Sequence, residues 1–196
     1  MTRAPAQRLV ELSAQDLTAR LAEALHVYVS AMGYPPGTAR QRRNLWLEHL
    51  NRPGWRAVGW LDAADSLLGV SYGYGGSQGQ WWYEEVRRGL RDSHGDQRWL
   101  EDYFELTELH VRPDVQGDGL GEALARRLLA HPANRHVLLS TPEADPPSRA
   151  WSLYRRLGFT DVLRHHRFTS DPRPFAVLGR ALPLEPPGTP HRPGRA

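Results

Sequence analysis

Hydrophobic residues recur along this chain with the two spacings that distinguish helices from strands. Leu17, Leu21 and Leu25 stand four residues apart, which places them on one face of a helix. Short apolar runs bounded by turn residues, such as residues 67–73, are typical of strands. The pattern predicts strands at residues 7–12, 55–61, 67–73, 103–111, 136–140, 159–168 and 175–182. It predicts helices at residues 13–32, 38–50, 82–90, 120–130 and 148–157. Ser13 is expected to cap the first helix.

The composition favours one soluble domain. The 196 residues are enough for one hydrophobic core, and no apolar stretch approaches the roughly 18 to 20 residues of a membrane span. The chain contains no cysteine and starts without an apolar signal segment, so we expect a cytoplasmic protein without disulfides and without membrane attachment. The net charge of +3 is small, and the arginines are scattered among acids, which argues against nucleic-acid binding.

A loop with three glycines follows the predicted strand 103–111 and leads into a helix that begins near Leu120. Glycines let the backbone approach a ligand closely, and a helix N-terminus presents unpaired N–H groups with a partial positive charge. The loop is therefore predicted to bind a phosphate group through its main chain. It is not a P-loop, because the chain contains no lysine. It is not a dinucleotide fingerprint, because Glu122 or Leu124 fills the place of the third small residue.

A second segment has the pattern of an amphipathic helix that ends in a glycine. Ala150, Leu153 and Leu157 share one helix face with Tyr154. Gly158 stands where a left-handed C-terminal cap is expected, and the next strand begins after it.

These two segments resemble signatures of the GNAT (Gcn5-related N-acetyltransferase) superfamily. The sequence Gln116-x-x-Gly119-x-Gly121 resembles its coenzyme A pyrophosphate loop. Residues 150–159 resemble its signature A-x-x-L-Y-x-x-L-G-F. The resemblance covers residues 7–182. It implies an α/β (α+β) fold, a mixed and mostly antiparallel sheet of about seven strands flanked by about four helices.

The resemblance also predicts the domain limits. We expect a single GNAT-like domain at residues 1–184. Residues 185–196, rich in proline, glycine and arginine, are expected to form a disordered tail.

Acetyl-CoA is the co-substrate that the resemblance implies. The loop would hold the pyrophosphate through backbone N–H groups and the helix dipole. Main-chain groups beside a bulge in strand 103–111 would face the pantetheine arm, and one N–H there would stabilise the thioester oxyanion. The cofactor-binding residues expected on this basis are Leu109, His110, Val111, Gln116, Gly117, Asp118, Gly119, Leu120 and Gly121.

Tyr154 matches the family's tyrosine, whose hydroxyl acts as general acid toward the departing thiolate. The alternative is that Tyr154 is only a core aromatic residue of an amphipathic helix. One departure lies nearby, because Pro147 replaces an asparagine that many members carry seven residues before the tyrosine.

Two carboxylates, Glu105 and Glu108, are the candidates for the base that takes the amine proton. Glu105 aligns with the glutamate of histone-type members, and Glu108 with a position that is often polar; Glu105 ranks first. Residues three apart in a regular strand point to opposite faces, so only one of them should face the acceptor unless a bulge rotates the other. Either carboxylate is alternatively an ion-pair partner of an arginine. His110 is a proton relay or a structural residue.

No metal site is expected. His165 and His166 are adjacent on a predicted strand and point to opposite faces, and no other spacing resembles a ligand cluster. The chemistry that the resemblance implies needs no metal.

The acceptor is expected to lie near residues 34–37 and the insertion 75–102, which is rich in aromatic and acidic residues. Aromatic faces and carboxylates suit an amine cation, so the insertion is interpreted as an acceptor lid. A solvated helix with one aromatic edge packed on the sheet, or a homodimer contact, are the alternatives. The function predicted is acetyl-CoA-dependent N-acetylation of a primary amine by direct transfer in a ternary complex. The amine belongs to a protein lysine, a protein N-terminus or a small molecule. The alternative is a non-catalytic acyl-CoA-binding or sensing domain of the same fold.

Overall fold

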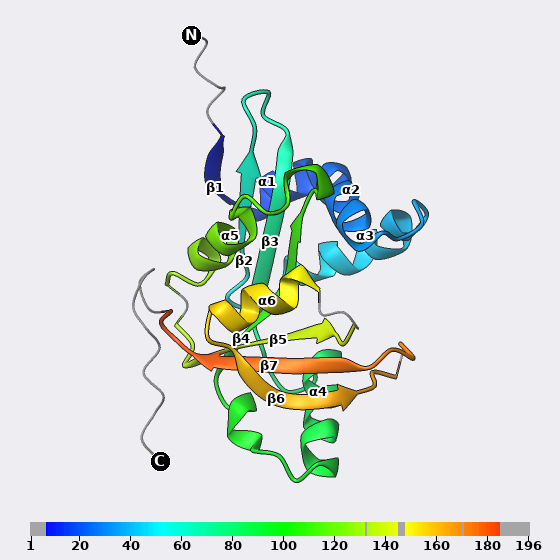
Figure 1. Ribbon diagram of the computed structural model, residues 1–196, viewed down its shortest axis with the longest axis vertical. Helices are drawn as coiled ribbons and strands as arrows, with labels where there is room; N and C mark the ends of the chain where they lie inside the picture. The colour runs from blue at the N-terminus through cyan, green and yellow to red at the C-terminus, as the bar shows by residue number, and fades with distance from the viewer. Residues whose placement is uncertain (1–6, 132, 145–147, 170, 185–196) are drawn as a thin grey trace. The chain divides into compact units, whose positions relative to one another are not determined.

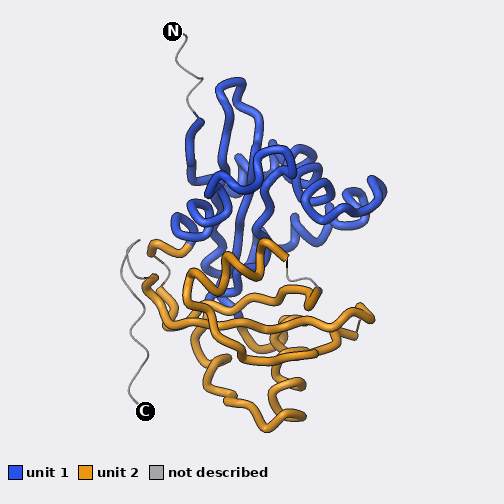
Figure 2. Tube along the Cα trace, viewed as in Figure 1, with its two compact units in different colours: residues 1–76, 104–128 blue, residues 77–103, 129–196 orange. Residues whose placement is uncertain are grey.

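A computed structural model describes residues 7–131, 133–144, 148–169 and 171–184. The tail predicted at residues 185–196 and Pro147 lie outside the described residues. The chain forms two compact units (Figure 2). Unit 1 comprises residues 1–76 and 104–128, and unit 2 comprises residues 77–103 and 129–196.

Unit 1 is built on antiparallel strands that pair in sequence order. Its strands are β1 (Arg8–Leu12), β2 (Arg56–Leu61), β3 (Leu67–Gly75) and β4 (Tyr103–Val111), the last belonging to unit 1 from Phe104 onward. Its helices are α1 (Ala14–Ala19), α2 (Leu21–Met32), α3 (Thr38–His49) and α5 (Leu120–Leu128), with a short 3-10 helix, η2 (Pro113–Val115).

The two faces of β3 are covered by different helices. Tyr72 and Tyr74 are buried in one core with residues of α2 and α3, such as Tyr28 and Trp46. The opposite face meets α5, because a Cβ placed on Gly69 would lie 2.9 Å from the Leu124 side chain. In Figure 1, α2 and α3 accordingly lie on one side of these strands and α5 on the other.

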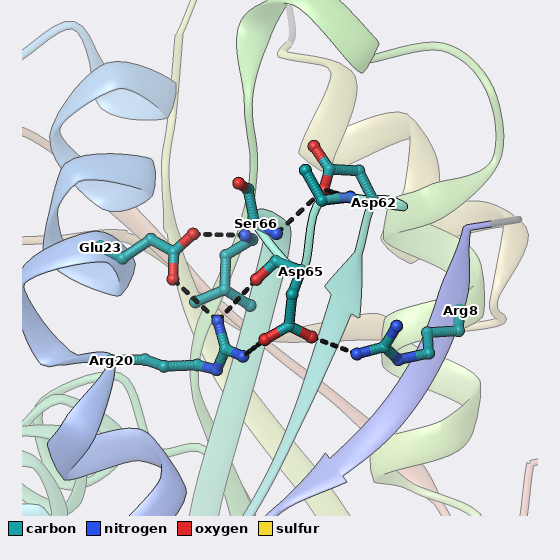
Figure 3. A network of polar contacts seen from close by, with 8 residues as sticks. Arg8, Arg20, Glu23, Asp62, Asp65 and Ser66 are labelled. Atoms are coloured by element: carbon teal, nitrogen blue, oxygen red, sulfur yellow. Dashed lines mark hydrogen bonds and ion pairs between the residues drawn. The ribbon is translucent and has the colours of Figure 1, made fainter. Parts of the chain in front are cut away.

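A network of charged groups joins the β2–β3 turn to the junction of α1 and α2 (Figure 3). The Arg20 guanidinium donates to Glu23, at 3.1 Å, and to both the carbonyl and the carboxylate of Asp65. Arg8 also donates to the Asp65 carboxylate, and the Leu67 N–H donates to Glu23 at 2.5 Å. Hydrogen bonds from Arg20 lower the pKa of Asp65. The helix predicted at residues 13–32 is interrupted at this arginine, which has φ −99° and ψ 11°.

Unit 2 contains three antiparallel strands in the order β5, β7, β6. These are β5 (His136–Pro142), β6 (Thr160–His166) and β7 (Phe175–Ala181). Its helices are α4 (Trp81–Asp92) and α6 (Arg149–Arg156), with a 3-10 helix, η1 (Gln97–Leu100). One face of α4 is buried among the strands in a core that contains Trp82, Val86, Leu90, Tyr103, Leu138, Leu163 and Val177.

The α6 segment ends as the sequence predicts. Ser148 caps its N-terminus by accepting the N–H of Trp151. Gly158 adopts φ 80°, and the Phe159 N–H donates to the carbonyl of Tyr154 at 3.0 Å. A left-handed glycine cap therefore reverses the chain into β6.

All the predicted strands are present, with ends that differ by no more than two residues. The sequence pattern predicts five helices and the family resemblance implies about four, whereas the described residues contain six α-helices. Part of the difference arises because the first predicted helix is two. No helix in the described ranges has both the length and the apolar character needed to cross a membrane.

Candidate active site

An extra residue in β4 decides which side chains share a face. Tyr72 of β3 pairs with Glu108, but the next residue, Gly73, pairs with Leu106, so Thr107 forms a bulge. The alternation of side chains shifts by one at this point, and Glu105 and Glu108 therefore face the same side. The strand is close to β3 here, because a Cβ on Gly73 would lie 2.1 Å from the Glu105 carbonyl oxygen.

Glu105 is 4% exposed and has neutral polar neighbours. Its Oε1 lies 3.4 Å from the Tyr74 hydroxyl and 3.5 Å from the Thr107 hydroxyl. Its buried Oε2 has no hydrogen-bond partner among the described residues. Burial raises the pKa of Glu105 to about 8, against the lowering effect of the Tyr74 hydrogen bond. Glu105 is consequently protonated at neutral pH in the free protein.

Glu108 and His110 form a pair on the same face. The His110 Nε2 lies 2.5 Å from Glu108 Oε2, and the side chains are 10% and 15% exposed respectively. The Ser71 hydroxyl fixes the strand at this point by donating to the Glu108 carbonyl at 2.8 Å. A carboxylate and an imidazole at hydrogen-bond distance form an arrangement that can take up a proton from a neighbouring donor and relay it.

Two tyrosine rings, from α2 and from the segment that follows it, pack in sequence against His110. The Tyr28 ring meets the His110 ring edge to face at 4.9 Å, and Tyr34 meets Tyr28 at 5.5 Å. Burial and the nearby Glu108 carboxylate raise the pKa of Tyr28 to about 12. The Tyr28 hydroxyl therefore remains protonated at physiological pH.

His49 belongs to the same cluster and was missed by the sequence interpretation. Its Nδ1 lies 3.0 Å from the Tyr72 hydroxyl, and its ring lies 5.1 Å from the Tyr74 ring. Burial lowers the pKa of His49 to about 4, so this imidazole is neutral at physiological pH. The available signal was its spacing, three residues after Trp46 on the buried face of α3.

The predicted order of strand, glycine loop and helix is confirmed, with β4 as the strand and α5 as the helix. Gly117 and Gly119 have φ angles of 104° and 82°, which favour glycine, and η2 precedes them. The Gln116 side-chain amide donates to the Val111 carbonyl at 2.9 Å and so ties the loop to the end of β4. A Cβ on Gly119 would meet no atom within 4 Å, so there is open space beside the backbone.

The loop fits an anionic group. Residues 120 and 121 begin α5, and the N–H groups of a first helical turn have no acceptor within the helix. The helix dipole adds a partial positive charge at the same place. The β4 residues expected to face a cofactor pair with β3 as Leu109 with Ser71, His110 with Val70 and Val111 with Gly69.

Tyr154 lies in α6 of unit 2 and is 6% exposed. Its ring packs on Phe159 with 5.6 Å between ring centres. A core aromatic position is therefore present, and the general-acid role of its hydroxyl remains a prediction.

The insertion is a packed helix rather than a bare loop. Trp82 of α4 is buried and donates through its indole N–H to the Ser140 hydroxyl at 3.2 Å. Two of its acids are already paired within the helix, Glu84 with Arg87 and Glu85 with Arg88. Trp81 is 53% exposed. The aromatic edge thus packs as one of the three interpretations states, while the lid and the homodimer contact remain predictions.

The described residues contain no group of three or more histidine, cysteine, aspartate or glutamate side chains arranged to hold a metal ion. His165 is paired with Glu143 at 2.5 Å, whereas His166 is 8% exposed and packs on Phe168.

Comparison with known proteins decides the family. Residues 78–161 match the family model of the acetyltransferase (GNAT) domain. The chain is 50% identical over 202 residues to a GCN5-like protein acetyltransferase of Mycobacterium tuberculosis, covering 90% of this chain and 98% of that protein. The chain belongs to the GNAT acetyltransferase family. The expectation that the chain is an acyltransferase of this family is confirmed.

Solved GNAT structures share its fold. The ribosomal-protein-S18-alanine N-acetyltransferase of Escherichia coli has a TM-score of 0.62 at 14% identity, covering 94% of this chain and 99% of that one. The PaiA N-acetyltransferase of Thermoplasma acidophilum, solved with coenzyme A, has a TM-score of 0.57 at 14% identity. That match covers 90% of this chain and 99% of the other. The predicted GNAT-like α/β fold is thereby confirmed.

Proposed function

We propose that this GNAT protein transfers the acetyl group of acetyl-CoA to a primary amine of a protein. The amine is a lysine side chain or an N-terminus, and transfer is direct, within a ternary complex. The bulge at Thr107 carries the proposal, because it brings Glu105, Glu108 and His110 to one face of the strand that leads into the glycine loop. The protein acceptor is supported by the 50%-identical relative, which is named a protein acetyltransferase.

The glycine loop is the proposed site of the coenzyme A pyrophosphate. Backbone N–H groups between Gln116 and Gly121 would bind the phosphates at the start of α5, where the open space beside Gly119 leaves room for them. Main-chain groups of residues 109–111 would bind the pantetheine arm. When bound, acetyl-CoA supplies the thioester that is attacked and the thiolate that leaves.

We assign removal of the amine proton to the Glu108–His110 pair. Glu105 is a poor base at neutral pH because burial keeps it protonated, whereas the Glu108 side chain is 15% exposed and lies 2.5 Å from His110. Above about pH 8, ionised Glu105 would add a second negative charge on the same face. Tyr154 is proposed as the general acid toward the departing thiolate, as the family signature implies.

The direct route needs no covalent intermediate on the enzyme. The chain contains no cysteine, so a cysteinyl acyl-enzyme is excluded. It also contains no lysine, so it cannot acetylate a lysine side chain of its own. The chemistry proposed requires no metal ion.

The test is release of free coenzyme A from acetyl-CoA with separate pools of acceptors. The pools are lysine peptides, peptides with free N-termini, polyamines and aminoglycosides, and mass spectrometry locates the added acetyl group. Turnover confined to the peptide pools supports the proposal. Turnover with small amines alone would refute the protein acceptor. Tight acetyl-CoA binding without coenzyme A release in any pool would support the non-catalytic sensing alternative.

A further inference from the structure

The first half of α3 carries a surface patch of positive charge. Arg40, Arg42 and Arg43, which we call the α3 arginine patch, are all exposed. The sequence contains no aspartate or glutamate between Glu23 and Glu48, so no acid within the helix turns on either side of the patch offsets this charge. Three guanidinium groups on one helical turn repel one another and are stabilised by any anion that binds between them.

Most other arginines in the described part of the chain form ion pairs with carboxylates, and the arginines of the patch do not. Arg20 binds Glu23 and Asp65, Arg52 binds Glu48, and similar pairs occupy both units. None of the arginines of the patch makes an ion pair with a carboxylate in the described residues. The two acids that border the acid-free segment are therefore already engaged elsewhere, and the patch is available to a partner.

The patch lies beside the candidate site. The guanidinium carbon of Arg42 is 6.0 Å from the centre of the Tyr28 ring. The Tyr28 ring in turn contacts the His110 ring at 4.9 Å, and His110 pairs with Glu108. A chain of contacts within unit 1 thus connects the positively charged surface to the residues proposed to accept the amine proton.

We propose that the α3 arginine patch binds acidic residues that flank the target amine of the protein acceptor. This inference rests on the proposed function. Guanidinium groups bind carboxylates through paired N–H donors, which gives orientation as well as attraction. A lysine with no acids beside it is repelled by the patch, so the patch selects acceptors by the charge around the amine.

Binding of matched peptides tests the inference without relying on turnover. One fluorescent peptide carries a lysine flanked by glutamates, and the other carries the same lysine flanked by glutamines. The double variant Arg40→Gln/Arg43→Gln removes two charges from the patch and leaves Arg42 against Tyr28. The control Arg91→Gln/Arg98→Gln removes the same charge from two exposed arginines of unit 2.

The unchanged protein and the control should bind the glutamate peptide about tenfold more tightly than the glutamine peptide. The Arg40→Gln/Arg43→Gln variant should lose most of this difference, and added salt should reduce it in the unchanged protein. Equal affinity for both peptides, or a preference that survives in the variant, would overturn the inference. Loss of binding to a DNA duplex in that variant alone, with no peptide preference, would assign the patch to nucleic acid instead.

Turnover of the same two peptides separates the two proposals. If the glutamine peptide is acetylated as efficiently as the glutamate peptide, acetyl transfer stands and the charge selection fails. If the glutamate peptide binds selectively but no acceptor is acetylated, the patch stands and the proposed transfer fails.

Discussion

Glu105 carries its carboxyl group into the interior of unit 1. One oxygen lies near two hydroxyl groups, and the other has no partner in the described part of the chain. Burying a carboxylate is costly, and this cost outweighs the opposing effects of the Tyr74 hydroxyl and of Arg52, so the protonated form is favoured and the pKa rises to about 8. This residue therefore links the stability of the fold to pH.

The folded protein retains the Glu105 proton at pH values where the unfolded chain has released it. Stability should therefore fall as the pH rises from the ordinary value of 4.5 toward about 8, by up to roughly 1.4 kcal/mol for each pH unit. The variant Glu105→Gln lacks this proton and should lose that part of the slope. Urea unfolding at several pH values checks this, with Glu108→Gln as the matched control. Parallel stability curves for Glu105→Gln and the unchanged protein would contradict it.

Tyr154 permits a single-atom test of the general acid. Phenylalanine preserves the ring contact with Phe159, so Tyr154→Phe should still fold. Without the hydroxyl, kcat should fall by about 100-fold, while the dissociation constant of acetyl-CoA should change little. Stopped-flow or steady-state kinetics together with calorimetry provide both values. An unchanged kcat would show that Tyr154 is only a core residue.

Sequence reasoning identified the candidate residues but not their arrangement. Glu105 and Glu108 were recognised as the candidate bases from the family pattern. That they share a face follows from the pairing of β4 with β3, and no local pattern in the sequence shows where a bulge occurs. The contact of His49 with Tyr72 joins positions 23 residues apart, and only the folded chain brings them together.

At the scale of elements, the loop before α5 depends on backbone conformation. Gly119 has a positive φ and open space around its Cα, and Gly33 at the end of α2 has the same two properties. Alanine at either place should therefore reduce stability by a similar amount, roughly 1 kcal/mol, through backbone strain alone.

The two glycines should differ in cofactor binding. Gly119→Ala should weaken the binding of coenzyme A by about tenfold or more, because strain displaces the N–H groups that face the phosphates. Gly33→Ala should leave this affinity unchanged. Calorimetric titration with coenzyme A needs no acceptor and measures both variants. Equal affinities in the two variants would place the pyrophosphate elsewhere.

The elements most accurately predicted were those with local signals. The Ser13 cap, the glycine end of α6 and the full extent of β4 were all confirmed. The break at Arg20 was not predicted, since the apolar spacing continues through it. Its guanidinium bridges Glu23 and Asp65, and the Asp65 partner is 45 residues away in sequence. Long-range polar contacts of this kind leave no periodic pattern.

At the scale of the whole molecule, different features of the chain indicate its family and its choice of acceptor. Two short motifs were enough to indicate the family because backbone conformation and cofactor shape constrain them, and a 50%-identical relative confirms it. Acceptor choice depends on surface charge. Among the described residues, most arginines are neutralised by local acids, and the α3 arginine patch is an exception. The proposed mechanism requires that the Glu108–His110 pair on the bulged strand β4 accept the amine proton.

The pH dependence of kcat/KM for acetyl transfer to a peptide tests that requirement most directly. The proteins to compare are the unchanged enzyme, Glu108→Gln and Glu105→Gln. Glu108→Gln should be slower by about 100-fold at neutral pH, because the proton acceptor is lost. Glu105→Gln should stay within about threefold of the unchanged enzyme at neutral pH and lack the change near pH 8 that ionisation of Glu105 causes in the unchanged enzyme. A Glu108→Gln enzyme with full activity, or a Glu105→Gln enzyme inactive at neutral pH, would contradict the account.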